Sequence, residues 1–303
     1  MSDPARRHTL PNGLEVAYQS KAELQQFYED IFEKQVYTRG GITLRDGDTV
    51  FDVGANIGLF TVFVAERWPA ARIFSFEPAP PLFEILRANT TRYGDRVQLF
   101  NCGLSNRAGE ARLTFYPHTS GMSSFYPDEQ QETAALRTLI RNEAQGRKEV
   151  EELRAYEDEL IEQRLRSETL VCPLRTLAEV VREEGVIRID LLKIDVEKSE
   201  MDVLDGLDEE AWSKIEQAVV EVHDLGNRLL DVQRLFRALG FAVTLEQDDL
   251  YQGSDRYNLY ALREHLRTSD LHHRRPDRAA ALNRIEDRAK RLRDAMHRGP
   301  RKS

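Results

Sequence analysis

The sequence predicts a doubly wound α/β domain, in which a mostly parallel sheet of seven strands carries helices on both faces. Short apolar segments typical of strands alternate along the chain with segments of helical periodicity. The strand-like segments are apolar enough to be buried on both faces, as the strands of parallel sheets are. The chain has 303 residues, of which 41% are hydrophobic, and it is therefore long enough to bury such a core.

The first half of the chain contains three of the expected core strands. Residues 21–37 place Leu24, Phe27 and Ile31 at helical spacing, so we expect a helix before the main domain. A polar turn, an apolar run, a glycine-broken loop and a helical pattern follow, and the prolines after the second strand are typical of a helix start. The expected elements are a strand at 49–53, a helix at 59–68, a strand at 71–78, a helix from about 80 and a strand at 97–102.

The alternation breaks after the third strand. A segment at 109–117 is expected to form an added strand, which pairs outside the core with a second added strand at 169–174. Between them, residues from about 128 to 168 form a highly charged stretch of helical character. We interpret this stretch as a helical lid insertion, with an ordinary surface insertion as the equal alternative.

The second half returns to the alternating pattern and supplies four more core strands. Apolar runs are again separated by segments of helical periodicity, without an internal repeat. The expected elements are a helix at 175–184, a strand within 187–197, a helix at 201–207, a strand at 218–222, a helix at 228–239 and strands at 241–245 and 258–262.

These elements divide the chain into an N-terminal helical segment at 1–44, the α/β domain at 45–265 and a basic helical tail at 266–303. From Arg263 onward, 13 Lys and Arg stand against 6 Asp and Glu, whereas the whole chain has a net charge of −9. The body is therefore acidic, which argues against a nucleic-acid partner. The tail has an apolar stripe at helical spacing, which fits either a terminal helix on its own domain or a docking helix for a partner.

Membrane and disulfide-rich classes do not fit the sequence. No apolar run reaches the roughly 18 to 20 residues that span a bilayer, and the N-terminus lacks a secretory pattern. We therefore expect a cytoplasmic protein without a membrane partner. The two cysteines, Cys102 and Cys172, are too far apart for a disulfide framework or a paired metal motif, and we expect both to be buried. The sequence leaves the oligomeric state open.

A glycine loop follows the first core strand, at Asp52, Gly54, Asn56 and Gly58. Glycine lets the backbone turn sharply and approach a ligand, and the next helix offers free N–H groups to an anionic group. We therefore expect a charged cofactor above this loop. The spacing differs from the dinucleotide and phosphate-loop motifs, which disfavours NAD and ATP. A turn that serves only packing is the alternative.

Carboxylates end two further strands at the same edge of the sheet. Glu77, followed by Pro78, ends the second strand, where it can accept hydrogen bonds from two ribose hydroxyls. Asp195 and Glu197 end the fourth core strand and share a face if the strand continues that far. Such a pair positions a hydroxyl or a cation, binds a divalent ion or orients a base. A carboxylate that caps the next helix is the alternative reading of each.

The fifth core strand brings Glu221 and His223 to this edge. An imidazole with an ordinary pKa of about 6.5 accepts a proton at neutral pH, so His223 is the expected general base. Glu197 or Glu221 is then expected to orient the ring. Asp195, Glu197 and His223 together also form a candidate site for Mg²⁺ or Mn²⁺. A histidine that only makes hydrogen bonds is the alternative.

Three motifs, DVGANIG at 52–58, FEP at 76–78 and LKIDVE at 192–197, occur in this order. Together they resemble the FkbM-like S-adenosylmethionine-dependent methyltransferases, over roughly residues 49–262. The resemblance implies a class I, Rossmann-like methyltransferase fold with S-adenosylmethionine as cofactor. It places residues 52–58 around the methionine part, Glu77 on the ribose, residues 101–104, with Cys102, Gly103 and Leu104, near the adenine, and Asp195 near the sulfonium. The family methylates hydroxyl groups of natural products, including polyketides and sugars.

Two further segments bear on this resemblance. Lys198 and Ser199 stand where small residues usually follow the glutamate in the family, which affects the local helix packing. The sequence FYPHTSGMSSFYP at 115–127 resembles the variant found within or beside polyketide and peptide synthetases. Its aromatic residues and Ser-Gly centre are expected to form a flexible cover over the substrate.

The sequence therefore predicts an O-methyltransferase that acts on a hydroxyl of a polyketide-like natural product. The substrate is a small molecule, either free or held on an acyl carrier protein or a synthetase. Two alternatives stay open. A nicotinamide-dependent oxidoreductase has a similar sheet, and a noncatalytic scaffold would use the basic tail to hold a carrier or a synthetase.

Overall fold

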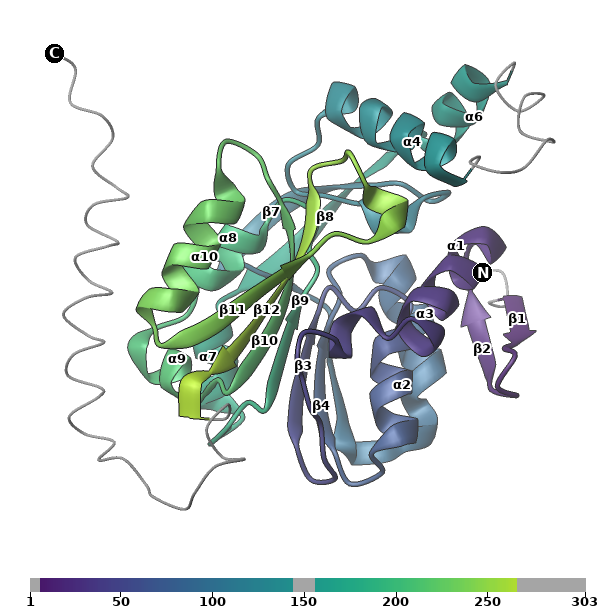
Figure 1. The fold of residues 1–303 in the computed structure, drawn as a ribbon. Helices are drawn as coiled ribbons and strands as arrows, with labels where there is room; N and C mark the ends of the chain where they lie inside the picture. Colours follow the sequence, from purple (N-terminus) through teal and green to yellow (C-terminus); the bar gives the residue numbers. More distant parts are fainter. Residues whose placement is uncertain (1–5, 144–155, 266–303) are drawn as a thin grey trace, which may run out of the picture.

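The computed structural model describes residues 6–143 and 156–265, and a seven-stranded sheet forms its centre (Figure 1). β12 runs antiparallel to both of its neighbours, β10 and β11, and the other neighbouring pairs are parallel. This sheet confirms the predicted, mostly parallel α/β class. The strands, in their order across the sheet, are β11 (Phe241–Glu246), β12 (Arg256–Arg263), β10 (Gln217–His223), β9 (Leu191–Ile194), β3 (Thr49–Val53), β4 (Arg72–Phe76) and β5 (Val97–Phe100).

Helices cover both faces of this sheet (Figure 1). Successive side chains of β3 enter two different cores: Val50 packs on the side of α2 and α3, whereas Phe51 and Val53 pack on the other side. Burial on both faces explains why these strands are apolar throughout. The helices of the first face are α2 (Leu59–Arg67) and α3 (Pro80–Thr90), and those of the second are α7 (Leu177–Glu183), α8 (Glu200–Asp205), α9 (Glu209–Lys214) and α10 (Arg228–Ala238).

A second, three-stranded sheet lies outside the core sheet. β7 (Gly109–Phe115) pairs antiparallel with β8 (Glu168–Arg175), which confirms the predicted pair of added strands. β6 (Gly103–Leu104) runs along the other edge of β8. The expected strand at 97–102 therefore ends at Phe100, because the chain crosses there from one sheet to the other.

Two helices of the predicted insertion lie between β7 and β8 in the chain, at one end of the molecule (Figure 1). They are α4 (Glu129–Glu143) and α6 (Glu157–Arg164). A small apolar cluster packs them against the preceding loop, and it contains Tyr116, Met122, Leu136, Ile140 and Ile161. The insertion thus has a core of its own, separate from the cores of the sheet.

The N-terminal segment differs from the single helix that the sequence predicts. A hairpin of β1 (Arg6–Thr9) and β2 (Glu15–Tyr18) comes first, and its strands are too short to give a clear pattern. α1 (Lys21–Tyr28) then continues as the π-helical turn η1 (Glu29–Glu33) and the 3₁₀ turn η2 (Val36–Thr38). Gln35 separates these turns with a φ of 54°, which interrupts the helix before residue 37.

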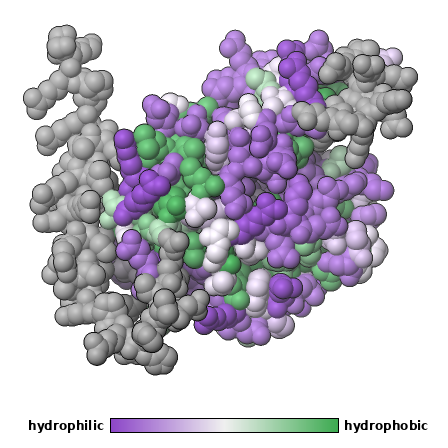
Figure 2. Space-filling view, in the orientation of Figure 1, coloured by the Kyte–Doolittle hydropathy of each residue, from purple (hydrophilic) through white to green (hydrophobic). Residues whose placement is uncertain are grey.

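The surface is largely hydrophilic in the view of Figure 2, with hydrophobic residues confined to smaller patches. Among the described residues, no helix has both the length and the apolar character that crossing a bilayer requires. Cys102 and Cys172 are buried and free, as expected. The predicted tail helix at 266–303 lies outside the described residues.

Candidate active site

The loop after β3 turns sharply at the carboxyl edge of the sheet and is held by main-chain hydrogen bonds. The backbone N–H groups of Gly54 and Ala55 donate to the carbonyl oxygen of Phe76 at 3.0 and 2.9 Å. Gly54 has a φ of +78°, and a Cβ at this position would lie 1.8 Å from the carbonyl oxygen of Asp195. Only glycine fits here, because the loops after β3 and β9 touch at this point.

Glu77 lies beside this loop at the end of β4. Its Oε2 accepts a hydrogen bond from the backbone N–H of Asn56 at 2.8 Å, and its Oε1 accepts one from Ala79 at 2.9 Å. Burial raises the pKa of Glu77 to about 7, although these backbone N–H groups lower it. The carboxyl group also lines a cavity over the loop, so its remaining lone pairs are available to a ligand. The predicted contact with a ribose requires this position.

Most of the predicted cofactor residues line the same cavity. The chain reaches it again where it crosses from β5 to β6, and this crossing brings residues 102–104 to the wall. Asn101 fixes the crossing by donating from Nδ2 to the carbonyl oxygen of Glu77 at 2.9 Å. The predicted residues on the wall are Gly54, Asn56, Glu77, Pro78, Cys102, Gly103, Leu104 and Asp195.

Asp52 and Gly58 are not among the described residues that line the cavity, so their expected contact with the cofactor is corrected. Asp52 is fully buried on the α2 side of β3, and its Oδ1 lies 3.1 Å from Lys193 Nζ. Gly58 precedes α2, where a Cβ would lie 2.5 Å from the side chain of Leu86. Both residues therefore hold the fold beneath the loop: the side chain of Asp52 points to the α2 side of β3, and the absence of a side chain at Gly58 lets α3 pack closely at Leu86.

Lys193 is a buried cation of the site that the sequence analysis did not single out. Its Nζ donates to the carbonyl oxygen of Gly54 at 2.8 Å and lies 3.7 Å from Asp195 Oδ2. Burial lowers the pKa of Lys193, but the carboxylates of Asp52 and Asp195 raise it above its ordinary value, so the ammonium stays charged. Its only signal in the sequence is a lysine within an otherwise apolar strand.

The N-terminal segment supplies a wall of the same cavity. The hydroxyl of Tyr37 donates to Asp195 Oδ2 at 2.7 Å, and Phe27, Asp30 and Ile31 line the cavity beside it. Burial raises the pKa of Tyr37 well above its ordinary value, so this phenol stays a donor. The helical periodicity of this segment predicts only a helix before the domain and does not indicate a part in the site.

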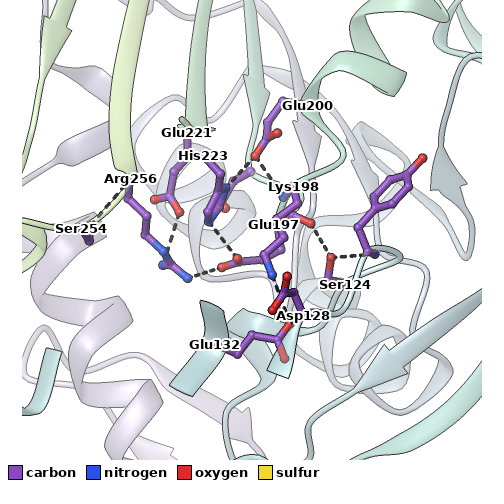
Figure 3. Close-up of polar contacts among 12 residues, drawn as sticks. Ser124, Asp128, Glu132, Glu197, Lys198, Glu200, Glu221, His223, Ser254 and Arg256 are labelled. Atoms are coloured by element: carbon purple, nitrogen blue, oxygen red, sulfur yellow. Dashed lines mark hydrogen bonds and ion pairs between the residues drawn. The ribbon is translucent and has the colours of Figure 1, made fainter. Parts of the chain in front are cut away.

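His223 lies in a cluster of carboxylates, of which Glu197 and Glu221 also line the cavity (Figure 3). Its Nδ1 is 2.7 Å from Glu200 Oε1, and its Nε2 is 3.0 Å from Glu197 Oε2. Burial lowers the pKa of His223, but the two carboxylates outweigh this effect and raise it to about 10. The ring is therefore an imidazolium at neutral pH.

This environment does not fit the prediction that His223 is the general base. The prediction for His223 assumes an ordinary pKa, and the side chain instead is charged, 3% exposed and absent from the described residues that line the cavity. Glu197 faces the ring as predicted. The second carboxylate on the ring is Glu200, in the first turn of α8, whereas Glu221 pairs with a different cation.

That cation is Arg256, which the sequence analysis did not identify (Figure 3). Its guanidinium lies 2.6 Å from Glu197 Oε1 and 3.4 Å from Glu221 Oε1. Arg256 reaches these groups because it is the register partner of His223 on the antiparallel strand β12. Burial and the negative charge of Asp195 raise the pKa of Glu221 to about 8, although Arg256 lowers it. Glu197 and Glu221 both line the cavity.

The predicted divalent ion does not fit this donor set. Glu197, Glu221 and His223 bring one ligand atom each to within 4.8 Å of one another, and Asp195 is not part of the group. However, Glu197 and Glu221 are paired with Arg256, and His223 is an imidazolium whose ring nitrogens face carboxylates. A metal ion needs a neutral imidazole and free carboxylate oxygens, so the guanidinium supplies the positive charge in its place.

The loop within 115–127 covers the cavity, and side-chain contacts hold it there. Ser120 Oγ lies 3.2 Å from both carboxylate oxygens of Glu23, and the backbone N–H of Gly121 donates to Glu23 Oε1 at 3.0 Å. Asn56 Nδ2 in turn donates to Ser120 Oγ at 3.2 Å. Ser120, Gly121 and Phe125 line the cavity, so part of the expected aromatic cover lies over the site.

The insertion reaches the site through Lys198. This residue has a φ of 73°, and its Nζ lies 3.2 Å from Glu132 Oε1 of α4, with both side chains buried. Ser124 Oγ donates to the carbonyl oxygen of Glu197 at 2.6 Å, next to the same turn (Figure 3). The lysine that departs from the family pattern thus connects the turn after β9 to α4.

The chain is similar in sequence to several known methyltransferases. The sequence model of a family described as "Methyltransferase FkbM domain" matches residues 52–243. A 31-O-demethyl-FK506 methyltransferase, FkbM of Streptomyces tacrolimicus, is 41% identical over 263 residues, which cover 87% of this chain and 99% of that protein. The methyltransferase sdnD of Sordaria araneosa is 32% identical over 239 residues, which cover 75% of this chain and 86% of the relative.

A much larger protein also contains a similar segment. The AMB antimetabolite synthetase AmbE of Pseudomonas aeruginosa is 43% identical over 262 residues, which cover 84% of this chain but 12% of AmbE. Among solved structures, a methyltransferase FkbM from Methylobacillus flagellatus is similar with 15% identity and a TM-score of 0.46, over 73% of this chain and 45% of the other.

Proposed function

This chain belongs to the FkbM methyltransferase family, and from that premise we propose that it transfers a methyl group from S-adenosylmethionine to a hydroxyl of a polyketide-like natural product. A 31-O-demethyl-FK506 methyltransferase is among its relatives, which supports the substrate class. The observation that carries the proposal is one cavity at the carboxyl edge of the sheet. The glycine loop, Glu77 and the carboxylates of Glu197 and Glu221 all line it.

The charge of the cavity suits a sulfonium cation. Its wall contains more acidic than basic side chains, and the basic ones, Lys193 and Arg256, are both paired with carboxylates. The residues that would hold the cofactor are the Gly54 loop, Glu77 and residues 102–104. When bound, S-adenosylmethionine supplies an electrophilic methyl group. The acidic residues on the wall are Asp30, Glu77, Asp195, Glu197, Glu221 and Asp248.

The chain's own part in the reaction is to align the acceptor oxygen and to take its proton. We assign to Glu221 the role of the base that accepts the hydroxyl proton. Its carboxyl lines the cavity, and its pKa of about 8 makes its ionised form a stronger base than an ordinary glutamate. Glu197 is a weaker candidate, since one of its oxygens faces Arg256 and the other faces His223. His223 then has a positioning role: it is the cation that pairs with Glu197 and Glu200 and holds both carboxylates in place.

A labelling experiment tests the function. The purified chain is incubated with S-adenosylmethionine that carries an isotope-labelled methyl group, and with hydroxylated polyketides that include 31-O-demethyl-FK506. Mass spectrometry should find the label on an acceptor oxygen, and calorimetry should show binding of S-adenosylhomocysteine. If S-adenosylhomocysteine does not bind to folded protein, the cofactor assignment is wrong. If it binds but no hydroxylated acceptor is labelled, the substrate class is wrong.

We also propose that the acceptor is presented on an acyl carrier protein or a synthetase. The support is the segment of AmbE that this chain resembles, which lies within a synthetase. Acceptors offered free and as carrier-bound thioesters should be compared in the same assay. A lower KM for the carrier-bound form is the expected result, and equal KM values would count against the proposal.

A further inference from the structure

A second cavity opens directly beside the cavity over the Gly54 loop, hereafter the cofactor cavity. It lies between α1, the loop at 118–122, α4 and the short turn η5 (Asp249–Tyr251). Phe27, Gly121, Tyr251 and Arg256 belong to the walls of both cavities, so the two spaces meet at these side chains. We propose that this second cavity, hereafter the acceptor cavity, binds a neutral, partly apolar molecule that carries the hydroxyl to be methylated. The proposal rests on the proposed function and names the site of its acceptor.

The position of the junction supports this assignment. Arg256 stands at the junction, and its guanidinium lies 2.6 Å from Glu197 and 3.4 Å from Glu221. The ring of Tyr251 lies beneath this guanidinium at 5.1 Å, and its hydroxyl accepts a hydrogen bond from Gln26 Nε2 at 2.9 Å. A molecule that extends from the acceptor cavity toward the cofactor therefore arrives beside the carboxylate to which we assign the proton.

The walls of the acceptor cavity indicate the chemistry of the acceptor. The lysine and arginine side chains of this wall have acidic neighbours: Arg256 lies beside Glu197 and Glu221, Lys34 lies 2.8 Å from Asp30, and the charge of Arg164 acts on Glu23 of the same wall. These cations have little charge left to offer an anionic acceptor. Apolar side chains and uncharged hydrogen-bonding groups make up much of the remaining wall, including Phe27, Met122, Leu136, Leu139, Gln25, Gln26, Thr119 and Thr138. Such a wall fits a molecule with apolar surface and scattered hydroxyl or carbonyl groups.

α4 contributes no residue to the described wall of the cofactor cavity, whereas α1 and the loop at 118–122 border both cavities. α1 lies outside the residues that match the family, and α4 belongs to the insertion between the two added strands. The cofactor side instead uses the loops after β3 and β4 and the crossing into β6. A change on α4 can therefore alter binding of the acceptor while cofactor binding stays the same.

Two neighbouring alanines of α4 give a matched test. Ala135 lines the acceptor cavity, whereas Ala134 is exposed on the same helix and is not part of the described wall. We would replace each by tryptophan, and use Thr138→Trp as a second cavity-filling variant in case Ala135→Trp does not fold. Nile red, a neutral and partly apolar dye, serves as the probe in the presence of S-adenosylhomocysteine, together with the KM of any acceptor labelled by the wild type.

The expected result separates the two cavities. A134W should bind Nile red and S-adenosylhomocysteine like the wild type. A135W or T138W should bind S-adenosylhomocysteine normally but Nile red about tenfold more weakly, and should raise the KM of the acceptor by a similar factor. Dye affinity and KM like those of A134W would overturn the acceptor cavity. Wild-type protein that binds S-adenosylhomocysteine but not Nile red would overturn the neutral, partly apolar class, whereas loss of S-adenosylhomocysteine binding in the wild type would count against the proposed function itself.

Discussion

The sheet edge and the cover meet in one cavity, but different kinds of contact hold them. At the sheet edge, backbone groups make most of these contacts. The Gly54 loop donates hydrogen bonds to the carbonyl oxygen of Phe76, and Glu77 accepts hydrogen bonds from two backbone N–H groups. The cover, formed by the N-terminal segment at 21–38, the loop at 118–122 and α4, is held largely by side chains. Its contacts to the edge are Tyr37 with Asp195, Ser120 with Asn56 and Lys198 with Glu132.

This difference teaches where the site tolerates change. A backbone hydrogen bond survives most substitutions, but a backbone turn of unusual φ does not, so the edge depends on a few irreplaceable positions. A side-chain contact is lost by any substitution of either partner, yet each contributes only about 0.5 to 1.5 kcal/mol. Changes at the edge should therefore abolish function, whereas changes in the cover should tune it.

Gly54→Ala should give the largest effect. A Cβ at Gly54 would lie 1.8 Å from the carbonyl oxygen of Asp195, so the loops after β3 and β9 must move apart. We expect S-adenosylhomocysteine binding to become undetectable by calorimetry and the melting temperature to fall. Gly47→Ala is the matched control, because Gly47 has a similar φ of +87° with nothing within 4 Å. This control should lose only about 1 kcal/mol from the left-handed backbone. Equal effects of the two variants would show that close contact of the loops is unimportant.

Glu221→Gln should come next, with a loss of about 10² to 10⁴ in kcat/KM and unchanged affinity for S-adenosylhomocysteine. In the wild type the neutral carboxyl is inactive as a base, and burial raises its pKa to about 8, so kcat/KM should rise with pH and level off above about 8. A base with the pKa of His223 would instead give a rise toward about 10. A pH profile of kcat/KM distinguishes these cases. If kcat/KM instead rises until about pH 10, His223 and not Glu221 is the general base.

These expectations also show which features can be predicted from the sequence. The core strands, the glycine loop and the positions of Glu77 and Glu197 follow from local patterns, since apolar runs and the residues that end them are contiguous in the chain. The pairing of His223 with Glu200 and of Arg256 with Glu197 does not. It depends on the register of β10 against β12 and on the first turn of α8, neither of which a local pattern specifies.

The same reasoning explains the corrections at Asp52 and His223. The motif places Asp52 in a ligand loop, but the alternation of side chains along β3 turns it toward α2, where Lys193 neutralises it. The residue type of His223 indicates a base, but its protonation is set by two carboxylates from other parts of the chain. Residue type and local position thus predict where a group lies better than they predict its charge.

His223→Gln should have an intermediate effect, on stability rather than on binding. The variant leaves Glu197 and Glu200 with less positive charge, and we expect a loss of about 3 kcal/mol in the free energy of unfolding near neutral pH. The folded pKa of His223 is raised to about 10 from 6.5, so its contribution is complete below about pH 6.5 and is lost as the pH rises toward 10. Urea unfolding of both proteins should show their difference shrinking over this range. A difference independent of pH would mean that the ring is not an imidazolium in the fold.

Glu23→Ala should have the smallest effect and tests the cover directly. The carboxylate of Glu23 holds Ser120 and Gly121 over the cavity, and Ser120 contacts Asn56 of the cofactor loop. Loss of these hydrogen bonds should destabilise the closed position of the cover by about 1 kcal/mol, so S-adenosylhomocysteine should bind about fivefold more weakly. Glu33→Ala, an exposed position beyond α1, should bind like the wild type. Because the cover contributes only part of the wall, and Glu23 also lines the acceptor cavity, Glu23→Ala should keep its kcat when both S-adenosylmethionine and the acceptor are saturating. A loss as complete as that of Gly54→Ala would mean that cover and edge form one rigid unit.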